Sequence, residues 1–409
     1  MNNPAMRFKR DDGTVFPDWS SSEIGNVADT CSGGTPSTSV SEYWDGPIQW
    51  LTPTEINSKY VHNSKRTITS AGIASSSAKL LPIGALLLTT RATIGACSIN
   101  NFDGDVSTNQ GFQSLICKSS LFNEYAYYAI TRDKFQKELI KHASGSTFLE
   151  ISSKNLKKLP IPIPCLEEQQ KIASFFSTLD QKIELNERKL EALEELKKGL
   201  MQKIFNREIR FKSKEGKDYP CWKIAKLSEI SQSLSYGLNA SAAQFDGKNG
   251  YLRITDIDER TNKYISSTRV SPSCNTDKKY LLKEGDIVFA RTGNSVGKTY
   301  IYKNTDGVLY YAGFLIRARL NPDVYPYFIF LQTLTNKYRK WVRIMSQRSG
   351  QPGINSEEYG NYKIVLPCLE EQEKIASVFR ELDKKIDLSL AKIASLKKLK
   401  QGFMQQMFV

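Results

Sequence analysis

Polar loops that carry Arg, Thr, Asn and Gln are the parts of this 409-residue sequence whose side chains could do chemistry. Two of them, Thr89–Thr93 and Thr108–Gly111, lie in the first half of the chain, and Arg291–Lys298 and Gln347–Gln351 lie in the second. Arg pairs well with O6 and N7 of guanine, and Asn or Gln with N6 and N7 of adenine. The loops therefore indicate base reading in a DNA groove, while ordinary turn chemistry explains any single loop equally well.

Residues of these types, in the loops and close to them, are our candidates for contacting DNA. They are Thr35, Arg66, Arg91, Thr93, Asn109, Gln110, Arg253, Arg291, Thr292, Asn294, Lys298, Arg348 and Gln351. Glycine in such a loop lets the backbone approach a phosphate closely. The run 291–298 does not fit the nucleotide-binding pattern GxxxxGK[ST], because Gly293 and Gly297 are only four residues apart.

The charge of the chain indicates a polyanionic partner. Lys and Arg number 57 against 43 Asp and Glu, which gives a net charge of +14. Segment 207–367 carries +11 of this excess and segment 1–164 only +2, so the second should supply most of the attraction to phosphate. Nucleic acid is the first expectation and an acidic membrane surface the second.

Several classes of protein are excluded by what the sequence lacks. The longest apolar stretch, Leu80–Leu88, contains Pro82 and Gly84 and is too short to cross a bilayer, and the first residues do not resemble a signal peptide. We therefore expect a soluble, cytoplasmic protein. Two histidines and seven scattered cysteines without a CxxC pair give no metal site and fit a reducing compartment.

Catalytic motifs are missing from the sequence as well. It has no [ND]PP[YF] methyltransferase motif, no GxG cofactor loop, no Walker A or helicase box and no zinc-deaminase set, so we expect no catalysis and no bound metal or cofactor. Asp256, Asp258 and Glu259 could imitate a nuclease cluster. Two alternatives stay open: a DNA-modifying enzyme with an unrecognised active site, and a coiled-coil scaffold that binds only proteins.

An internal duplication organises the chain. Pro164–Ile183 and Pro367–Ile386 are identical at 15 of 20 positions with an offset of 203 residues. The same offset relates Arg7, Trp19, Met201 and Phe205 to Arg210, Trp222, Met404 and Phe408. A fainter match pairs Gly111-Phe112 with Gly313-Phe314. Two variable segments thus alternate with two similar ones, which suggests one shared structural role and two versions of one task.

The similar segments predict two long helices that pack along their length. Apolar residues recur at alternating steps of four and three, the heptad spacing of a coiled coil. The predicted seam residues are Ile172, Phe176, Leu179, Ile183, Leu190, Leu193 and Leu200 in the first helix and Ile375, Phe379, Leu382, Ile386, Ile393, Leu396 and Phe403 in the second. Both seams hold polar residues at the same two positions, Asn186/Ser389 and Lys197/Lys400.

An antiparallel pairing of these helices would give the duplicated chain a pseudo-twofold axis. The alternative is two surface helices that each pack on their own domain. The variable segments mix strand-like runs, such as Leu86–Thr90 and Asp286–Ala290, with short helices such as Asn123–Ala143. The predicted fold class is therefore α+β, with two mixed α/β domains joined by two long helices that form an antiparallel coiled coil.

The order of these segments resembles the specificity subunit of type I restriction–modification systems. The resemblance rests on the helix start Pro164-Cys165-Leu166-Glu167-Glu168-Gln169, repeated at Pro367–Gln372, and on the run Ser32–Ile56. It implies target recognition domains at 1–163 and 207–366 and helical regions at 164–206 and 367–409. The second domain departs from the family pattern, since Ser235–Asn239 replaces the first domain's GGTPS opening.

The same resemblance implies a function in a complex. Each recognition domain would read one half of a bipartite asymmetric DNA site, and the helices would set the spacing of the half-sites and dock DNA methyltransferase (modification) subunits, expected in two copies. Restriction subunits that translocate DNA would join through the complex. This chain would have no catalytic role, and S-adenosylmethionine, ATP and Mg²⁺ would bind to the partner subunits.

Overall fold

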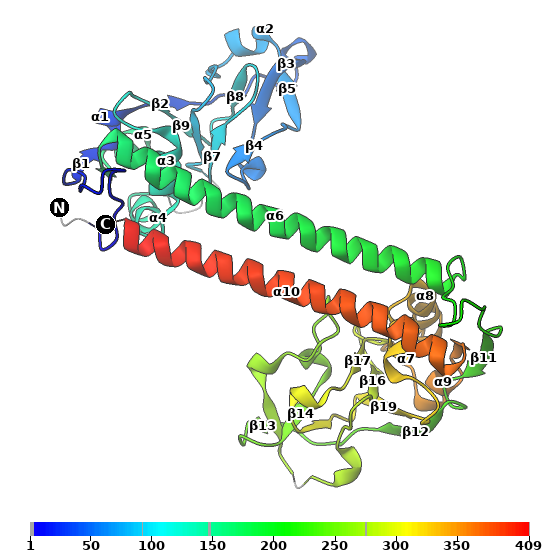
Figure 1. Cartoon of the computed structure of the whole chain (residues 1–409). Coiled ribbons are helices and arrows are strands. Elements are labelled where there is room, and N and C mark those ends of the chain that lie inside the picture. The colour runs from blue at the N-terminus through cyan, green and yellow to red at the C-terminus, as the bar shows by residue number, and fades with distance from the viewer. Residues whose placement is uncertain (1–3, 92, 146–148, 275, 409) are drawn as a thin grey trace. The chain divides into compact units, whose positions relative to one another are not determined.

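A computed structural model describes residues 4–91, 93–145, 149–274 and 276–408 of the chain. The chain divides into two compact units, and each contains parts of both long helices. The first unit comprises residues 1–188 and 391–409, and the second comprises residues 189–390. Each unit is described on its own below (Figure 1).

The described residues of the first unit form ten strands and the shorter helices between them. Its five-stranded sheet has the order β2-β9-β6-β7-β4, its three-stranded sheet has the order β5-β3-β8, and β1 pairs with β10. The strands are β1 Ser20–Glu23, β2 Ala28–Ser32, β3 Trp44–Leu51, β4 Tyr60–Val61, β5 Arg66–Ile68, β6 Leu86–Leu88, β7 Cys97–Asn100, β8 Val106–Thr108, β9 Gln113–Cys117 and β10 Pro160–Ile163. The helices are α1 Ile24–Val27, α2 Ser70–Ala74, α3 Asn123–Thr131, α4 Asp133–Lys141 and α5 Ser153–Lys157.

The second unit repeats this plan with differences in its sheets. A four-stranded sheet has the order β12-β19-β16-β17, and three strand pairs, β11-β20, β13-β15 and β14-β18, complete it. The strands are β11 Lys223–Lys226, β12 Ser231–Tyr236, β13 Ala242–Gln244, β14 Gly250–Leu252, β15 Val270–Pro272, β16 Ile287–Ala290, β17 Thr299–Ile301, β18 Leu309–Tyr311, β19 Leu315–Leu320 and β20 Lys363–Leu366. The helices are α7 Pro326–Thr333, α8 Asn336–Met345 and α9 Ser356–Gly360.

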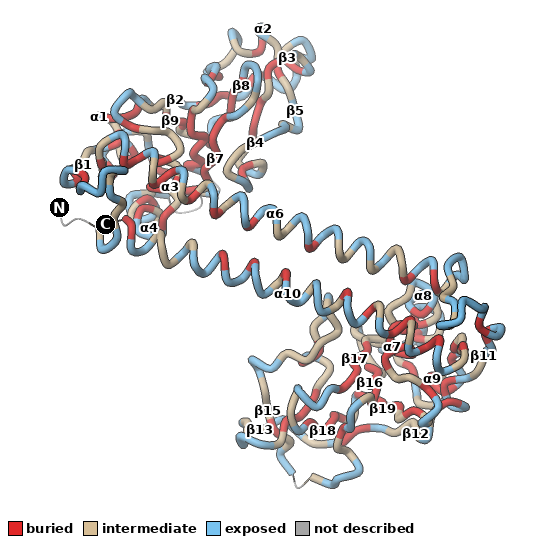
Figure 2. Tube along the Cα trace, in the orientation of Figure 1, coloured by how far each residue is buried: buried red, intermediate tan, exposed pale blue. Residues whose placement is uncertain are grey.

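Apolar runs account for the central strands. Every residue of β6 and β16 is buried, so these strands have protein on both faces, as their unbroken apolar sequences require. Short helices such as α3 and α7 bury most of their residues against the same cores. Figure 2 shows the buried residues gathered at these central strands and helices, with exposed residues along the connecting loops.

Two long helices, α6 (Leu166–Phe205) and α10 (Leu369–Met407), pair in opposite directions within each unit. In the first unit Ile172 and Phe176, early in α6, share a core with Met407 at the end of α10. In the second unit Ile375 and Phe379, early in α10, share a core with Ile204 at the end of α6. The predicted class, a duplicated α+β chain with two paired long helices, is confirmed.

All the predicted seam residues of α6 and α10 are buried or half-buried. The two lysines at polar seam positions find partners on the opposite helix. The Lys400 Nζ lies 2.6 Å from the Asp180 carboxylate in the first unit, and the Lys197 Nζ lies 2.6 Å from that of Asp383 in the second. Among the described residues, no helix is apolar over a length that would cross a membrane.

Strand register corrects one match within the repeat. Leu51 of β3 faces Thr108 of β8, and Leu252 of β14 faces Tyr311 of β18. Thr108 and Tyr311 therefore correspond, again at an offset of 203 residues, although Leu51 and Leu252 are 201 residues apart. Phe112 therefore corresponds to Leu315, and both side chains are fully buried. Phe314 takes the place of Gly111. The pairing of Gly111-Phe112 with Gly313-Phe314 was wrong by one residue. The same dipeptide, Gly-Phe, occurs in both halves of the chain, and the sequence alone does not give the strand register.

Candidate nucleic-acid interface

Four loops of the first unit meet at one end of its strands. Three of them follow β2, β6 and β8, and the fourth is the segment directly before α5. Backbone hydrogen bonds tie them together: Gly34 N donates to Thr108 O at 2.8 Å, Thr90 N to Gly111 O at 2.8 Å, and Ile151 N to Thr90 O at 3.1 Å. A Cβ on Gly33 would lie 2.0 Å from the Asn109 carbonyl oxygen, so this crossing needs glycine. We call this group the first loop cluster.

The second unit builds an equivalent group, the second loop cluster. Leu238 N donates to Tyr311 O at 2.8 Å, Arg291 N to Phe314 O at 3.0 Å, and Ile354 N to Arg291 O at 2.9 Å. Gly237 occupies the crossing, where a Cβ would lie 2.2 Å from the carbonyl oxygen of Ala312. The two clusters thus share a backbone framework although few of their residues are alike.

The first loop cluster brings together five of the six candidates from its unit. Thr35 Oγ1 donates to Gln110 Oε1 at 2.5 Å, and the Asn109 side chain accepts from Gly111 N at 2.9 Å. Arg91 and Thr93 are exposed on the loop after β6. Arg66 lies apart on β5, where its guanidinium stacks 3.4 Å from the ring centroid of Trp44.

The second loop cluster holds Arg291, Thr292, Asn294, Arg348 and Gln351. The Arg291 guanidinium lies 4.9 Å from the ring centroid of Tyr236, and the loop of Thr292 pairs with Gly353. Gln351 lies beside Gly293, 3.2 Å from where a Cβ would be. The Arg348 guanidinium is held by Glu358 at 2.5 Å and by backbone carbonyls.

Two further candidates of the second unit have partners within the chain. Arg253 makes a two-bond contact with Asp256 at 2.7 and 2.9 Å, and Lys298 donates to the Ile257 carbonyl at 3.1 Å. Asp256 is buried and also accepts from the Arg253 backbone, just as Glu55 caps Thr52 in the first unit. Among the described residues no three His, Cys, Asp or Glu side chains are grouped to hold a metal ion.

Two aromatic residues of the second loop cluster were missed by the sequence analysis. Phe314 is 60% exposed and Tyr236 is 41% exposed, which is unusual for large apolar side chains. Both are adjacent to Arg291, one through its backbone and the other under its guanidinium. The signal that could have found Phe314 is its correspondence to Gly111, which only the strand register reveals.

Buried carboxylates attach each domain to the start of its long helix. Glu168 is fully buried and accepts from Arg7 at 3.0 and 2.7 Å and from the Trp19 indole at 2.9 Å. Glu371 accepts from Arg210 at 3.2 and 2.8 Å and from Trp222 at 2.9 Å. These two anchors explain why Arg, Trp and Glu recur at an offset of 203 residues.

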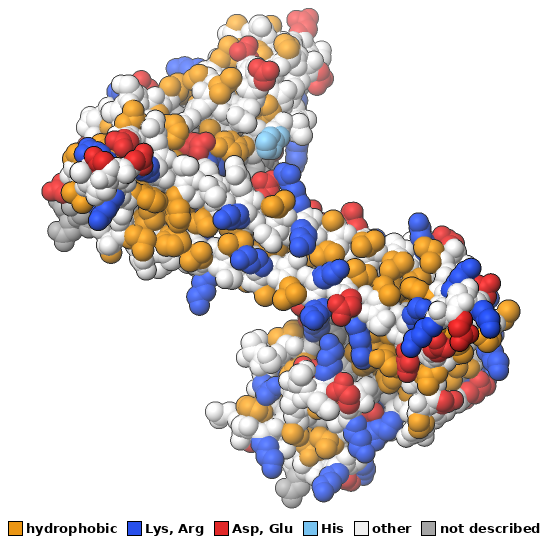
Figure 3. All heavy atoms as spheres, in the orientation of Figure 1, with side chains coloured by type: hydrophobic (Ala, Val, Ile, Leu, Met, Phe, Trp, Pro, Cys, Tyr) orange, Lys and Arg blue, Asp and Glu red, His pale blue; other side chains and the backbone are white. Residues whose placement is uncertain are grey.

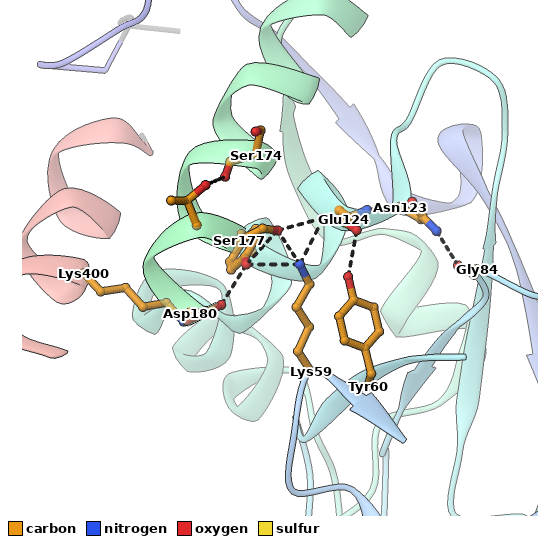
Figure 4. A network of polar contacts seen from close by, with 11 residues as sticks. Lys59, Tyr60, Gly84, Asn123, Glu124, Ser174, Ser177, Asp180 and Lys400 are labelled. Atoms are coloured by element: carbon orange, nitrogen blue, oxygen red, sulfur yellow. Dashed lines mark hydrogen bonds and ion pairs between the residues drawn. The ribbon is translucent and has the colours of Figure 1, made fainter. Parts of the chain in front are cut away.

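A polar network joins the first domain to α6 and α10 (Figure 4). Lys59 Nζ donates to Ser177 Oγ at 2.6 Å and to the Glu124 carboxylate at 3.0 Å, and Asp180 accepts from Tyr128 at 2.7 Å and from Lys400. Burial lowers the pKa of Lys59 more than Glu124 raises it. Burial raises the pKa of Glu124, but hydrogen bonds from Tyr60, Lys59 and Ser177 outweigh burial and bring the pKa below its usual value. The carboxylate therefore stays charged.

Comparison with known proteins gives the family. A family profile described as "Type I restriction modification DNA specificity domain" matches residues 17–195 and 212–398. The MjaIX specificity subunit of Methanocaldococcus jannaschii is 29% identical over 98% of this chain and 95% of its own length. The MjaVIII specificity subunit of the same organism is 28% identical over 68% of each chain.

A solved structure agrees with this assignment at the level of the fold. The type I restriction–modification S subunit of M. genitalium superposes with a TM-score of 0.64 and 18% identity, and the match covers 100% of this chain and 99% of that one. The resemblance drawn from the repeated helix starts is thereby confirmed. The chain belongs to the type I restriction–modification DNA specificity family.

Proposed function

We propose that this chain selects the DNA sequence for a type I restriction–modification complex and has no chemistry of its own. The domain at 1–163 reads one half of a bipartite, asymmetric site, and the domain at 207–366 reads the other half. The observation that carries this proposal is the pair of loop clusters. They share a backbone framework and differ in their side chains, as two readers of different half-sites should.

The net charge differs between the two domains and supports binding to DNA. Segment 207–367 carries a net charge of +11, and Lys and Arg side chains are spread over the visible face of the second unit (Figure 3). Contacts with phosphate position a protein on DNA but do not specify sequence. The second domain is therefore proposed to supply most of the salt-dependent affinity.

The helical regions 164–206 and 367–409 are proposed to set half-site spacing and to dock two modification subunits. Restriction subunits join through the complex, and S-adenosylmethionine, ATP and Mg²⁺ belong to the partners.

Inserting one heptad after Asn186 and another after Ser389 keeps both seams in register and lengthens each helix by about 10 Å. We expect the native site to lose methylation; an unchanged motif, spacer and rate would contradict the spacing role.

Reconstitution tests the proposed function. The isolated chain should bind DNA weakly, with an affinity that falls steeply as salt increases, and should transfer no methyl group. With the modification subunit and S-adenosylmethionine it should direct methylation to one bipartite motif. Replacing 207–366 by the segment of a relative should change one half of that motif only. Methyl transfer by the chain alone, or a change in both halves, would refute the proposal.

A further inference from the structure

Helix α8 of the second unit exposes a cationic surface that the chain itself does not neutralise. The exposed residues Lys337, Arg339, Lys340 and Arg343 lie on this surface, which we call the α8 cationic face. Within the described parts of the chain, the side chains of these four residues make no hydrogen bond or ion pair. The sequence 336–348 contains no Asp or Glu at all. An anion from outside the chain is therefore free to bind here.

One edge of α8 leads directly into the second loop cluster. Arg339, Arg343 and Ser346 are spaced i, i+4 and i+7, so they follow one side of the helix. At the end of this edge, Ser346 O accepts a hydrogen bond from Gly353 N at 3.2 Å, and Gly353 pairs with Thr292. The two arginines thus lie beside the loops that are proposed to read bases.

The first unit has an equivalent helix without these arginines. The offset of 203 residues aligns α4 with α8 and matches the buried residues of one helix to those of the other. Gln136 and Ile140 stand at the positions of Arg339 and Arg343. The Gln136 side chain donates to Gly95 O at 3.0 Å and so serves the fold of its own unit. The arginine pair is therefore a feature of the second domain alone.

This helix also accounts for much of the uneven charge of the two domains. Residues 336–348 carry a net charge of +5, and the aligned residues 133–145 carry +1. The two segments 207–367 and 1–164 differ by nine charges, and four of the nine come from this comparison. Nearly half of the excess positive charge of the second domain thus lies on one helix and the turn after it.

The spacing and polarity of the arginine edge fit the backbone of DNA. Arg339 and Arg343 are about 6 Å apart along the helix axis. Each strand of B-DNA carries one phosphate for every ~3.4 Å of its axis, so two long side chains can reach neighbouring phosphates. A protein partner would cover apolar residues at the centre of its interface. The exposed apolar residue of α8, Ile344, lies about 100° farther around the helix than Arg343.

We propose that Arg339 and Arg343 bind phosphates of the DNA backbone beside the second half-site. Lys337 and Lys340 add general attraction from the rest of the α8 cationic face. This inference rests on the proposed function, which supplies DNA as the partner. Its new content is a site separate from the base-reading loops, with no counterpart to its arginines in the first unit. Contacts with phosphate carry no sequence information, so this site gives affinity without specificity.

The double variant Arg339→Gln, Arg343→Gln tests this site. Both side chains are exposed, and like charges four residues apart in a helix repel, so we expect thermal unfolding at the wild-type temperature or above. Each lost phosphate contact should reduce the slope of log affinity against log salt by about 0.9. A rise from about 50 to about 200 mM salt should therefore weaken the wild type roughly twelvefold more than the variant.

These affinities are measured on the full chain assembled with its modification subunit, and the methylated motif should be the same for both proteins. Duplexes with single uncharged methylphosphonates identify the contacts. Because α8 is about 15 Å long, the contacted phosphates should lie within about five base pairs of the second half-site. Methylphosphonates there should weaken the wild type and leave the double variant unaffected. Equal losses for both proteins at every position would overturn the inference.

A matched control is the double variant Lys223→Gln, Lys226→Gln, which removes two charges from exposed positions of the same unit. These lysines lie on β11, which leads into the start of β12, whereas the second loop cluster follows the end of β12. The control should keep the wild-type salt slope. A loss of slope as large as that of the arginine variant would contradict the proposed site, because the position of the charges would then not matter.

The wild-type complex separates this inference from the proposed function. If it methylates no bipartite motif, the proposed function itself fails. If it methylates one and the arginine variant keeps the wild-type salt slope, only the α8 site is refuted. An arginine variant that binds DNA normally but loses modification subunits in native mass spectrometry would also refute the site, because its occupant would then be a protein.

Discussion

The two loop clusters share a backbone framework and present different chemistry. In the first cluster, Gln110 accepts a hydrogen bond from Thr35, and the loop after β8 has no side chain at Gly111. In the second, Phe314 occupies the position of Gly111 and lies next to Arg291, which stacks on Tyr236. The first surface is neutral and polar, and the second is cationic and aromatic. In the proposed function, the shared strands fix where each loop cluster lies, and the loop side chains decide which bases it reads.

The buried carboxylate anchors at Glu168 and Glu371, unlike the loop clusters, are nearly identical in the two units. Glu168 and Glu371 have the same donors, Arg and Trp, at nearly the same distances in both units. A buried carboxylate is costly unless it is paired, so neither partner can change alone. Exposed loop residues carry no such constraint. This difference explains why the duplication is plain at the anchors and faint in the loops.

The largest expected effect is the loss of an anchor. Glu168→Ala or Glu371→Ala leaves a half-buried Arg and a buried Trp indole without the carboxylate that both bind, and each should cost about 3 kcal/mol of stability. Urea unfolding followed by Trp fluorescence measures the change. Glu167→Ala, at a half-exposed position, is the control and should cost less than about 0.5 kcal/mol. An anchor variant as stable as this control would show that the repeated contacts do not hold the domains.

An intermediate effect is expected from Arg291. If its guanidinium reads a base in the second half-site, Arg291→Ala should cost about 1–3 kcal/mol of discrimination there. Methylation rates on duplexes with one base pair changed at a time give this value, and the first half-site serves as the internal control. An equal loss on every sequence, with a smaller salt dependence, would assign Arg291 to a phosphate instead.

The smallest expected effect concerns Phe314. An exposed aromatic ring beside Arg291 suits an apolar contact such as the methyl group of thymine. Phe314→Ala should then cost about 1 kcal/mol, the value of one buried methyl or methylene group, at a thymine of the second half-site. Deoxyuridine in place of that thymine should weaken the wild type but not the variant. Equal losses for both proteins would show that Phe314 does not contact the methyl group.

Much of the fold could be predicted because its signals are long and periodic. The heptads of α6 and α10 and the repeated helix starts predict two paired helices and a duplication without any structure. The loop clusters were predictable only as residue types. The partner of Arg253 lies three residues away and that of Lys298 about forty, and neither contact has a periodic signature. Phe314 was missed because its position depends on strand register, which short strands leave undetermined.

The most direct test of the central claim, that each loop cluster reads its own half-site, is methylome sequencing with two combined variants. One carries Asn109→Ala and Gln110→Ala, and the other carries Arg291→Ala and Gln351→Ala. The account predicts that each variant relaxes base preference in one half of the motif, that the two halves differ, and that the spacer is unchanged. Relaxation of the same half by both variants, or a uniform loss of methylation without relaxation, would contradict it.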